Sequence, residues 1–239
     1  MAESVPFKPL WSGLTAAEGK RRDLLEIVLA YGMIMLVVWT PRSWQRLLWW
    51  VAAASITAMV CLSFRGAKAM GLHPTGFFRS FWVVSVALLC GAGAVILAIH
   101  FHTLTVPQRT IALTWNWWPY LLWSLAQQFL LQVFFLERLL RLLKDSGLAV
   151  LIAAILISAA HLPNPVLTPM TFLWGFAACW LFLRYRNLYV LGLVHMILGL
   201  TIGATVPVTV THHMRVGLGY LTYAPPYRSA IGPQSSGPK

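Results

Sequence analysis

The chain has 239 residues, of which 59% are apolar and only 10% are charged. Soluble domains carry about a quarter charged residues, so this composition excludes a soluble globular protein and indicates an integral membrane protein. The formal net charge of +12 would favour a nucleic-acid partner in a soluble protein. Here the basic residues lie almost entirely in short segments between apolar runs, where they set topology and meet anionic lipid headgroups. The expected partner is therefore the lipid bilayer, and no nucleic acid.

Seven apolar runs approach the roughly 20 residues that a membrane-spanning helix needs. In chain order they cover residues 24–40, 44–63, 81–101, 117–137, 147–161, 166–183 and 188–207. The polar segment 1–22 ends in a Lys-Arg-Arg cluster, and no small-residue cleavage site follows soon after the first run. This pattern predicts a cytoplasmic N-terminal segment and a retained first helix rather than a cleaved signal peptide.

We therefore expect an all-α fold, a polytopic membrane bundle of about seven (six to eight) transmembrane helices over residues 23–210. The tail at 211–239 is rich in Gly, Pro and Ser. Such a segment is expected to be flexible, or bound to a partner. No internal repeat and no separate soluble domain is evident, so the spanning region is expected to form one bundle.

The basic residues predict the orientation of this bundle. With the N-terminus inside, the inner segments hold twelve of them: Lys8, Lys20, Arg21, Arg22, Arg65, Lys68, Arg79, Arg138, Arg141, Lys144, Arg184 and Arg186. The outer connectors and tail hold six: Arg42, Arg46, Arg109, Arg215, Arg228 and Lys239. This asymmetry predicts a multi-pass protein of the cell (inner or plasma) membrane, with a cytoplasmic N-terminus and its C-terminus on the opposite side.

Polar side chains within the fourth run are the first candidates for function, because polar groups at hydrocarbon depth are costly to bury. Ser124, Gln128 and Gln132 follow one another at intervals of four residues, so they form one stripe on a helix. Gln127 lies about 100° round from Gln128. These amides either join neighbouring helices by hydrogen bonds, as is common in membrane bundles, or belong to a functional site. Just before them, Tyr120 belongs with Trp115, Trp117 and Trp118 to an expected interfacial aromatic belt.

Two histidines on later helices are candidates for the same interior. His161 ends the fifth run, immediately before a turn bounded by Pro163 and Pro165. His195 lies about two turns into the last run, roughly 10 Å inside the bilayer by the rise of a helix. Three helices thus deliver polar groups toward one interior, which favours a site over packing alone.

The remaining polar residues have simpler interpretations. His100 and His102 at the outer end of the third run are expected to be solvated at the interface, with pigment or haem ligation as the alternative. Glu137 is expected to form an interfacial ion pair with Arg141, one turn along the same helix. The cysteines, such as Cys179, all lie in apolar runs and read as small buried hydrophobic residues.

These residues together resemble the CPBP family, the CAAX proteases and bacteriocin-processing enzymes, which are glutamate-dependent intramembrane endopeptidases. The resemblance covers residues 115–205. The family's Glu-Glu-x-x-x-Arg motif corresponds to Gln127, Gln128 and Gln132, and its Phe-x-x-x-His motif ends at His161. Its His-x-x-x-Asn motif begins at His195, and Gly199 stands where the asparagine would be.

The resemblance implies that Gln127, Gln128, Gln132, His161 and His195 occupy the catalytic positions. In the family a glutamate acts as general base, but a glutamine amide accepts no proton near neutral pH. Replacing two carboxylates and an arginine by amides gives a neutral cluster that costs less to bury. The sequence thus predicts an endopeptidase-like protein that is impaired or inactive by the usual route.

Several alternatives stay open. His161 and His195 serve an active endopeptidase, or the protein is a pseudoenzyme that acts as a scaffold or accessory subunit of a membrane complex. No cofactor is expected, although the two histidines are weak candidates for a metal site. The expected partners are membrane-embedded peptides or other membrane-protein subunits.

Overall fold

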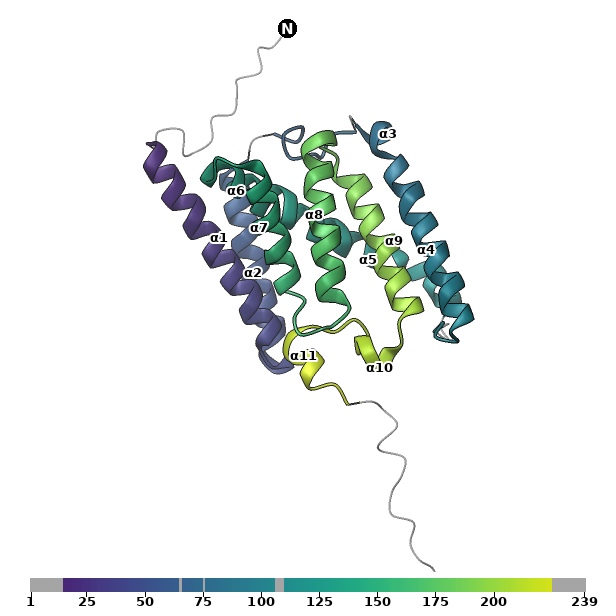
Figure 1. Cartoon of the computed structure of the whole chain (residues 1–239). Helices are drawn as coiled ribbons and strands as arrows, with labels where there is room; N and C mark the ends of the chain where they lie inside the picture. The colour runs from purple at the N-terminus through teal and green to yellow at the C-terminus, as the bar shows by residue number, and fades with distance from the viewer. Residues whose placement is uncertain (1–14, 65, 75, 106–109, 225–239) are drawn as a thin grey trace, which may run out of the picture.

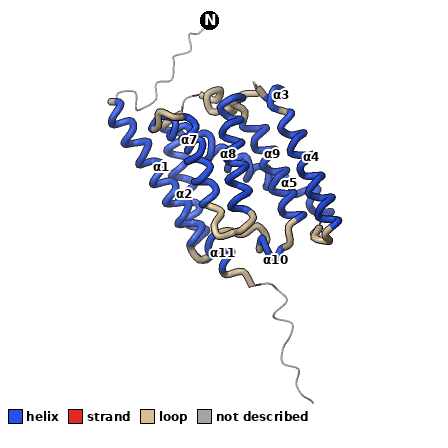
Figure 2. Tube along the Cα trace, in the orientation of Figure 1, coloured by secondary structure: helices blue, strands red, loops and turns tan. Residues whose placement is uncertain are grey.

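The computed structural model of this protein describes residues 15–64, 66–74, 76–105 and 110–224, with the backbone alone for 110–116. Within these ranges the chain is helical and has no strand (Figure 2). In chain order the elements are α1 (Ala16–Trp39), α2 (Arg42–Leu62), α3 (Phe77–Ser80), α4 (Trp82–His100), α5 (Thr110–Phe129), η1 (Leu130–Leu136), α6 (Glu137–Leu142), α7 (Ser146–Ala159), α8 (Leu167–Tyr185), α9 (Leu188–Thr205), α10 (Val208–Thr211) and α11 (Gly217–Leu221). Here η1 is a π-helical segment that continues α5 into α6.

Each of the seven apolar runs lies mostly within a helix, and five helices of the described chain are long and apolar enough to cross a membrane. These are Arg42–Leu62, Phe77–His100, Trp117–Leu142, Leu167–Tyr185 and Leu188–Thr205. The other two differ for local reasons, because α1 carries charged residues over its first three turns and α7 has only 14 residues. The prediction of an all-α polytopic membrane bundle is thereby confirmed.

The outer helices expose apolar side chains that a soluble protein would bury. Helix α2 buries only Ala52 and Val60, while Trp44 and Trp50 are 64% and 63% exposed. Leu89 on α4 is 73% exposed. Large apolar surfaces of this kind are stable only against lipid, so this is a multi-pass membrane protein in contact with the bilayer.

The long helix formed by α5, η1 and α6 is the centre of the bundle. Figure 1 shows it crossing behind α8 and α9, with α1 at one side of the molecule and α4 at the other. Along its length it packs first against α9, then against α7 and α8, and finally against α1. Its η1 segment is buried almost throughout, with Phe134 and Leu136 fully enclosed. Side chains on this helix can therefore meet residues from most of the bundle.

Residues 186–189, Arg-Asn-Leu-Tyr, form the turn between α8 and α9 and the start of α9. Arg186 adopts a left-handed backbone conformation, with φ of 49°, that ends α8. The side chain of Asn187 then caps α9 by accepting a hydrogen bond from the Val190 amide at 3.0 Å. Since a capped helix has a fixed starting point, this turn sets the depth at which α9 places His195.

Residues 211–224, the first part of the tail expected to be flexible or partner-bound, are folded against the bundle. The side chain of Asn164, which is fully buried, donates to the carbonyl oxygens of Thr211 at 3.0 Å and Arg215 at 2.9 Å. The Gly217 amide donates to the Leu162 carbonyl at 2.7 Å, and α11 packs against α1. Buried polar groups in folded proteins are hydrogen-bonded, and here these bonds attach the start of the tail to the bundle. Residues 225–239 of the tail lie outside the described chain.

Candidate functional site

A continuous hydrogen-bonded network joins the central helix to α9. Gln132 donates from Nε2 to Gln128 Oε1 at 3.2 Å, and Gln128 Nε2 lies 3.0 Å from His195 Nδ1. Gln128 and Gln132 are 1% and 0% exposed. The spacing of four residues therefore forms the polar stripe that the sequence predicts, and the stripe meets the predicted histidine.

A change of helix type occurs within this network. Gln128 lies in the last turn of α5, and Gln132 lies in the π-helical segment η1. A π segment bonds i to i+5, so it widens the turn and rotates every side chain that follows it. Such segments occur often at functional sites and cost stability where packing alone would favour a regular helix. The residues just beyond it, at the start of α6, consequently point in directions that a regular helix would not give.

The hydrogen bonds assign the ring protons of the two histidines. Gln128 uses its oxygen to accept from Gln132, so its NH₂ group donates to Nδ1 of His195, and Nε2 of that neutral ring carries the hydrogen. For His161, Nδ1 lies 2.7 Å from the Ile157 carbonyl oxygen. A carbonyl only accepts, so Nδ1 carries the hydrogen there and Nε2 has a free lone pair.

The rings of His195 and His161 carry their hydrogens on different nitrogens. Because they have opposite tautomers, His195 offers an N–H donor and His161 offers an acceptor. This pairing is what a site needs to hold a carbonyl group beside a water or amide hydrogen.

Two predicted residues behave differently from Gln128. Gln127 is half-buried, and its side chain makes no hydrogen bond with any residue that the structure describes. Ser124 belongs to the stripe and is fully buried, yet its hydroxyl has no hydrogen-bond partner in the described chain. Oε1 of Gln132 is also without one, although the Cys179 thiol lies beside that side chain. The network therefore contains unused hydrogen-bonding capacity within the bundle.

Tyr120, a member of the expected interfacial aromatic belt, also contacts α9 close to this network. A Cβ atom built on Gly199 would lie 2.0 Å from the Tyr120 hydroxyl oxygen. The hydroxyl thus fills the space that a side chain at position 199 would take, which is where the resemblance expects an asparagine. Extending the interval of four residues back from Ser124 would have pointed to Tyr120.

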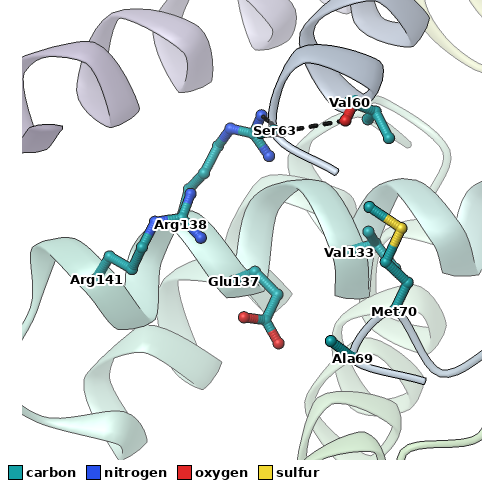
Figure 3. A pocket seen from close by; sticks show the side chains of 8 residues that line it. All are labelled: Val60, Ser63, Ala69, Met70, Val133, Glu137, Arg138 and Arg141. Carbon is teal, nitrogen blue, oxygen red and sulfur yellow. Dashed lines mark hydrogen bonds between the residues drawn. The ribbon is translucent and has the colours of Figure 1, made fainter. Parts of the chain in front are cut away.

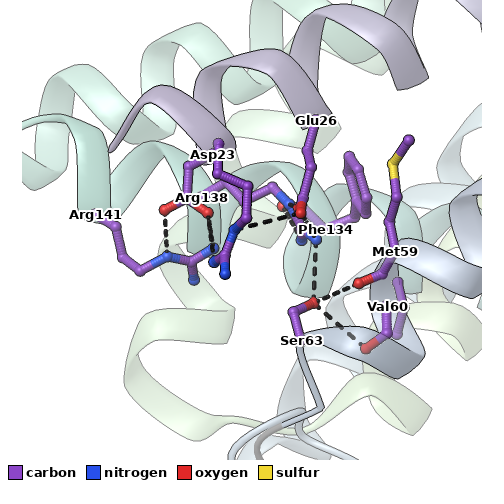
Figure 4. Close-up of polar contacts among 9 residues, drawn as sticks. Asp23, Glu26, Met59, Val60, Ser63, Phe134, Arg138 and Arg141 are labelled. Carbon is purple, nitrogen blue, oxygen red and sulfur yellow. Dashed lines mark hydrogen bonds and ion pairs between the residues drawn. The ribbon is translucent and has the colours of Figure 1, made fainter. Parts of the chain in front are cut away.

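The carboxylates lie elsewhere. Asp23 and Glu26 on α1 bind arginines of α6 (Figure 4): Arg141 lies 2.6 Å from Asp23, and Arg138 lies 2.5 Å from Glu26. The other described carboxylates are Glu18 and Asp145, which cap α1 and α7, and Glu137, which is paired with Arg186. Of the six acidic residues in the sequence, only Glu3 is outside the described chain. Each described carboxylate is therefore engaged outside the glutamine–histidine network.

The expected ion pair of Glu137 with Arg141 is wrong. Arg141 faces α1 and pairs with Asp23, whereas Glu137 faces the turn after α8 and pairs with Arg186. The two side chains are held apart by these different partners, Asp23 on α1 and Arg186 at the C-terminal end of α8. Glu137, Arg138 and Arg141 line a small pocket with residues of α2 and of the 66–74 loop (Figure 3). None of the glutamines or histidines of the network lines this pocket.

The structure offers little for a metal ion. Across the described ranges, no three His, Cys, Asp or Glu side chains converge in a way that could hold one. His100 and His102 are exposed at the end of α4, and His100 packs its ring edge against Phe101. Neither His100 nor His102 therefore belongs to a set of metal ligands within the described ranges.

Comparison with protein families finds a match over part of the chain. Residues 109–201 match the family model described as "Type II CAAX prenyl endopeptidase Rce1-like". This segment runs from α5 to α9 and includes Gln127, Gln128, Gln132, His161 and His195. The resemblance that the sequence motifs predicted is confirmed by this match. Neither the curated proteins nor the solved structures contain a match to the chain.

Proposed function

We propose that this protein, a CAAX-protease-like membrane protein whose residues 109–201 are Rce1-like, binds membrane-embedded or prenylated peptides without hydrolysing them by a glutamate-dependent route. The proposal assigns peptide binding to the region around Gln127, Gln128, Gln132, His161 and His195. It makes the protein a pseudoenzyme, suited to act as an accessory or scaffold subunit of a membrane complex.

The observation that carries the proposal is the hydrogen bonding of Gln128. Its oxygen accepts from Gln132 and its NH₂ group faces His195, so both ends of the amide are engaged in a neutral network. A general base must take up a proton, which an amide does not do near neutral pH. Since each described carboxylate is engaged elsewhere, none is available to take over.

The neutral network still supports binding. His195 presents an N–H donor, and the Oε1 atom of Gln132 and the hydroxyl of Ser124 have unused hydrogen-bonding capacity. Buried groups of this kind cost about 1–3 kcal/mol each when left without a partner. A bound peptide would satisfy them, which favours a site retained for recognition over one that has decayed.

A cleavage and binding assay in lipid nanodiscs tests the proposal. The probe is a farnesylated peptide ending in Cys-Val-Ile-Met, with a fluorophore and a quencher on either side of the bond after the cysteine. We expect saturable binding, and release of fluorophore no faster than that of a His161→Ala, His195→Ala double variant. Failure of the wild-type protein to bind the probe would contradict the proposal.

A second candidate function is a histidine-dependent endopeptidase, and one observation favours it. The hydrogen bond from His161 to the Ile157 carbonyl leaves Nε2 of that ring free to accept a proton from water. In the same assay this mechanism predicts cleavage by the wild-type protein that His161→Ala abolishes and Gln127→Ala largely preserves. Cleavage with that pattern would replace the first proposal by the second.

The proposed orientation is N-terminus inside and C-terminus outside, in the cell (inner or plasma) membrane. The excess of basic residues in the expected inner segments supports it, and so does the position of the start of α1 and of α11 at opposite ends of the bundle (Figure 1). Reporter fusions that are active on only one side of the membrane test this at the two termini. Equal activity of the same reporter at both termini would refute it.

A further inference from the structure

A stripe of four polar side chains runs along the central helix toward α9. Tyr120, Ser124, Gln128 and Gln132 follow at intervals of four residues, so they share one face. The two ends of the α5 part of this stripe are fixed by contacts with α9. Tyr120 lies against Gly199, and Gln128 lies against His195. Ser124, one turn from each, consequently lies along the same interface.

The close approach of α5 and α9 depends on glycine. A Cβ atom at Gly192 would lie 2.3 Å from a methyl group of Leu125, and one at Gly199 would lie 2.0 Å from the Tyr120 hydroxyl oxygen. Small residues of this kind let two membrane helices pack backbone to backbone. The absence of a side chain at position 199 also leaves room for a hydroxyl group from the other helix.

The Ser124 hydroxyl has an unusual environment. Serine and threonine hydroxyls inside membrane helices commonly donate to the carbonyl four residues earlier, as those of Thr201 and Thr205 do on α9 at 2.8 and 2.7 Å. Ser124 is 0% exposed and makes no such bond to any described residue. A buried hydroxyl without a partner is costly, which indicates that its partner is a bound group.

The Tyr120 hydroxyl lies near His195. Gly199 is four residues after His195, so their Cβ positions are neighbours on α9, about 5–6 Å apart. The Tyr120 hydroxyl occupies the Cβ position of Gly199. It therefore lies within about one helical turn of the imidazole that presents an N–H donor.

We propose that the hydroxyls of Tyr120 and Ser124 bind a backbone carbonyl group of a membrane-embedded peptide, together with His195. The proposal rests on the proposed function and adds two ligand-binding residues to it. Each of the three groups is a neutral donor. A carboxylate would need a cation, and the arginines of the described central helix, Arg138 and Arg141, are bound to carboxylates of α1. An uncharged peptide carbonyl is the acceptor that fits this set.

The test compares binding of two farnesylated peptides to the full-length protein in lipid nanodiscs. One has an ordinary amide after the cysteine, and the other has an alkene isostere, which lacks the carbonyl oxygen. Tyr120→Phe removes only the hydroxyl, and Ser124→Ala removes the second one. Tyr31→Phe is the matched control, because Tyr31 lies on α1 and packs against Phe135 rather than α9.

Tyr120→Phe is expected to weaken binding of the amide peptide about five- to tenfold, the loss of one neutral hydrogen bond. Binding of the alkene peptide is expected to be weaker in the wild-type protein and unchanged by the same substitution. Ser124→Ala should weaken binding of the amide peptide by a smaller factor and leave binding of the alkene peptide unchanged. Tyr31→Phe should change the binding of neither peptide. Melting temperatures measured alongside identify any variant that fails to fold, and the remaining hydroxyl variant then gives the comparison.

The outcomes separate this inference from the proposed function. If the wild-type protein binds the amide peptide and both hydroxyl variants bind it equally well, the inference is refuted and peptide binding stands. An equal loss for the amide and alkene peptides also refutes it, because the hydroxyls would then act on something other than the carbonyl. If the wild-type protein binds neither peptide, the proposed function itself fails.

Discussion

Removing the negative charge of Glu26 should strongly destabilise the bundle. Its carboxylate lies 2.6 Å from Nε of Arg138, whose side chain is only 2% exposed. The arginine also donates to the Ser63 hydroxyl at 3.1 Å and to the Phe134 carbonyl at 3.2 Å, and its guanidinium lies 3.8 Å from the Phe134 ring centroid. The substitution Glu26→Gln keeps the shape of the side chain but leaves this enclosed cation without its partner.

The expected loss is about 3–5 kcal/mol, the cost of an uncompensated buried charge. For a chain of this size, that corresponds to a fall in melting temperature of roughly 10 °C. Arg22→Gln is the control, because Arg22 also contacts Glu26, at 3.4 Å, but is 22% exposed. Partly exposed pairs of this kind contribute about 0–1 kcal/mol, so this variant should lose only a few degrees.

Tryptophan fluorescence of the purified protein in detergent, followed on heating, measures both effects. The double variant Glu26→Leu, Arg138→Leu should recover most of the loss, since removing both charges also removes their desolvation cost. Equal melting temperatures for Glu26→Gln and Arg22→Gln would refute the assignment of Arg138 as a buried cation held by α1.

Three further predictions concern the site and its surroundings. Gly199→Asn alone should lower the melting temperature, because its Cβ would lie 2.0 Å from the Tyr120 hydroxyl. Adding Tyr120→Ala should restore the melting temperature, and a failure to do so would contradict this contact. Asn164→Ala removes four hydrogen bonds of a buried amide and should lower the free energy of unfolding by about 2–4 kcal/mol. Hydrogen exchange should then rise in residues 208–221, and unchanged exchange would count against the packing of this segment on the bundle. Gln128→Leu should abolish probe binding if it holds His195 as the 3.0 Å contact indicates, whereas Gln127→Leu should weaken it less, and the reverse order would contradict the network.

The sequence was a reliable guide where the determinants are local. Each of the seven apolar runs falls mostly within a helix, and five of these helices are long and apolar enough to cross a membrane. Asn187 and Asp145 cap α9 and α7 close to the expected starts of those helices. The interval of four residues placed Gln128 and Gln132 on one face, and they form a hydrogen bond in the structure. These features depend on neighbours within one or two turns, so the order of residues is sufficient to determine them.

The pairing of residues between helices was decided only by the tertiary structure. The sequence predicted Arg141 as the partner of Glu137, but Arg141 pairs with Asp23 on α1 and Glu137 pairs with Arg186 at the C-terminal end of α8. The contact of the Tyr120 hydroxyl with Gly199 on α9 likewise joins residues that lie far apart in the sequence. The sequence by itself thus determined a membrane bundle with neutral amides at motif positions. Which groups meet there depends on helix packing, because an ion pair or a close contact between distant residues forms only when the folded chain brings them together.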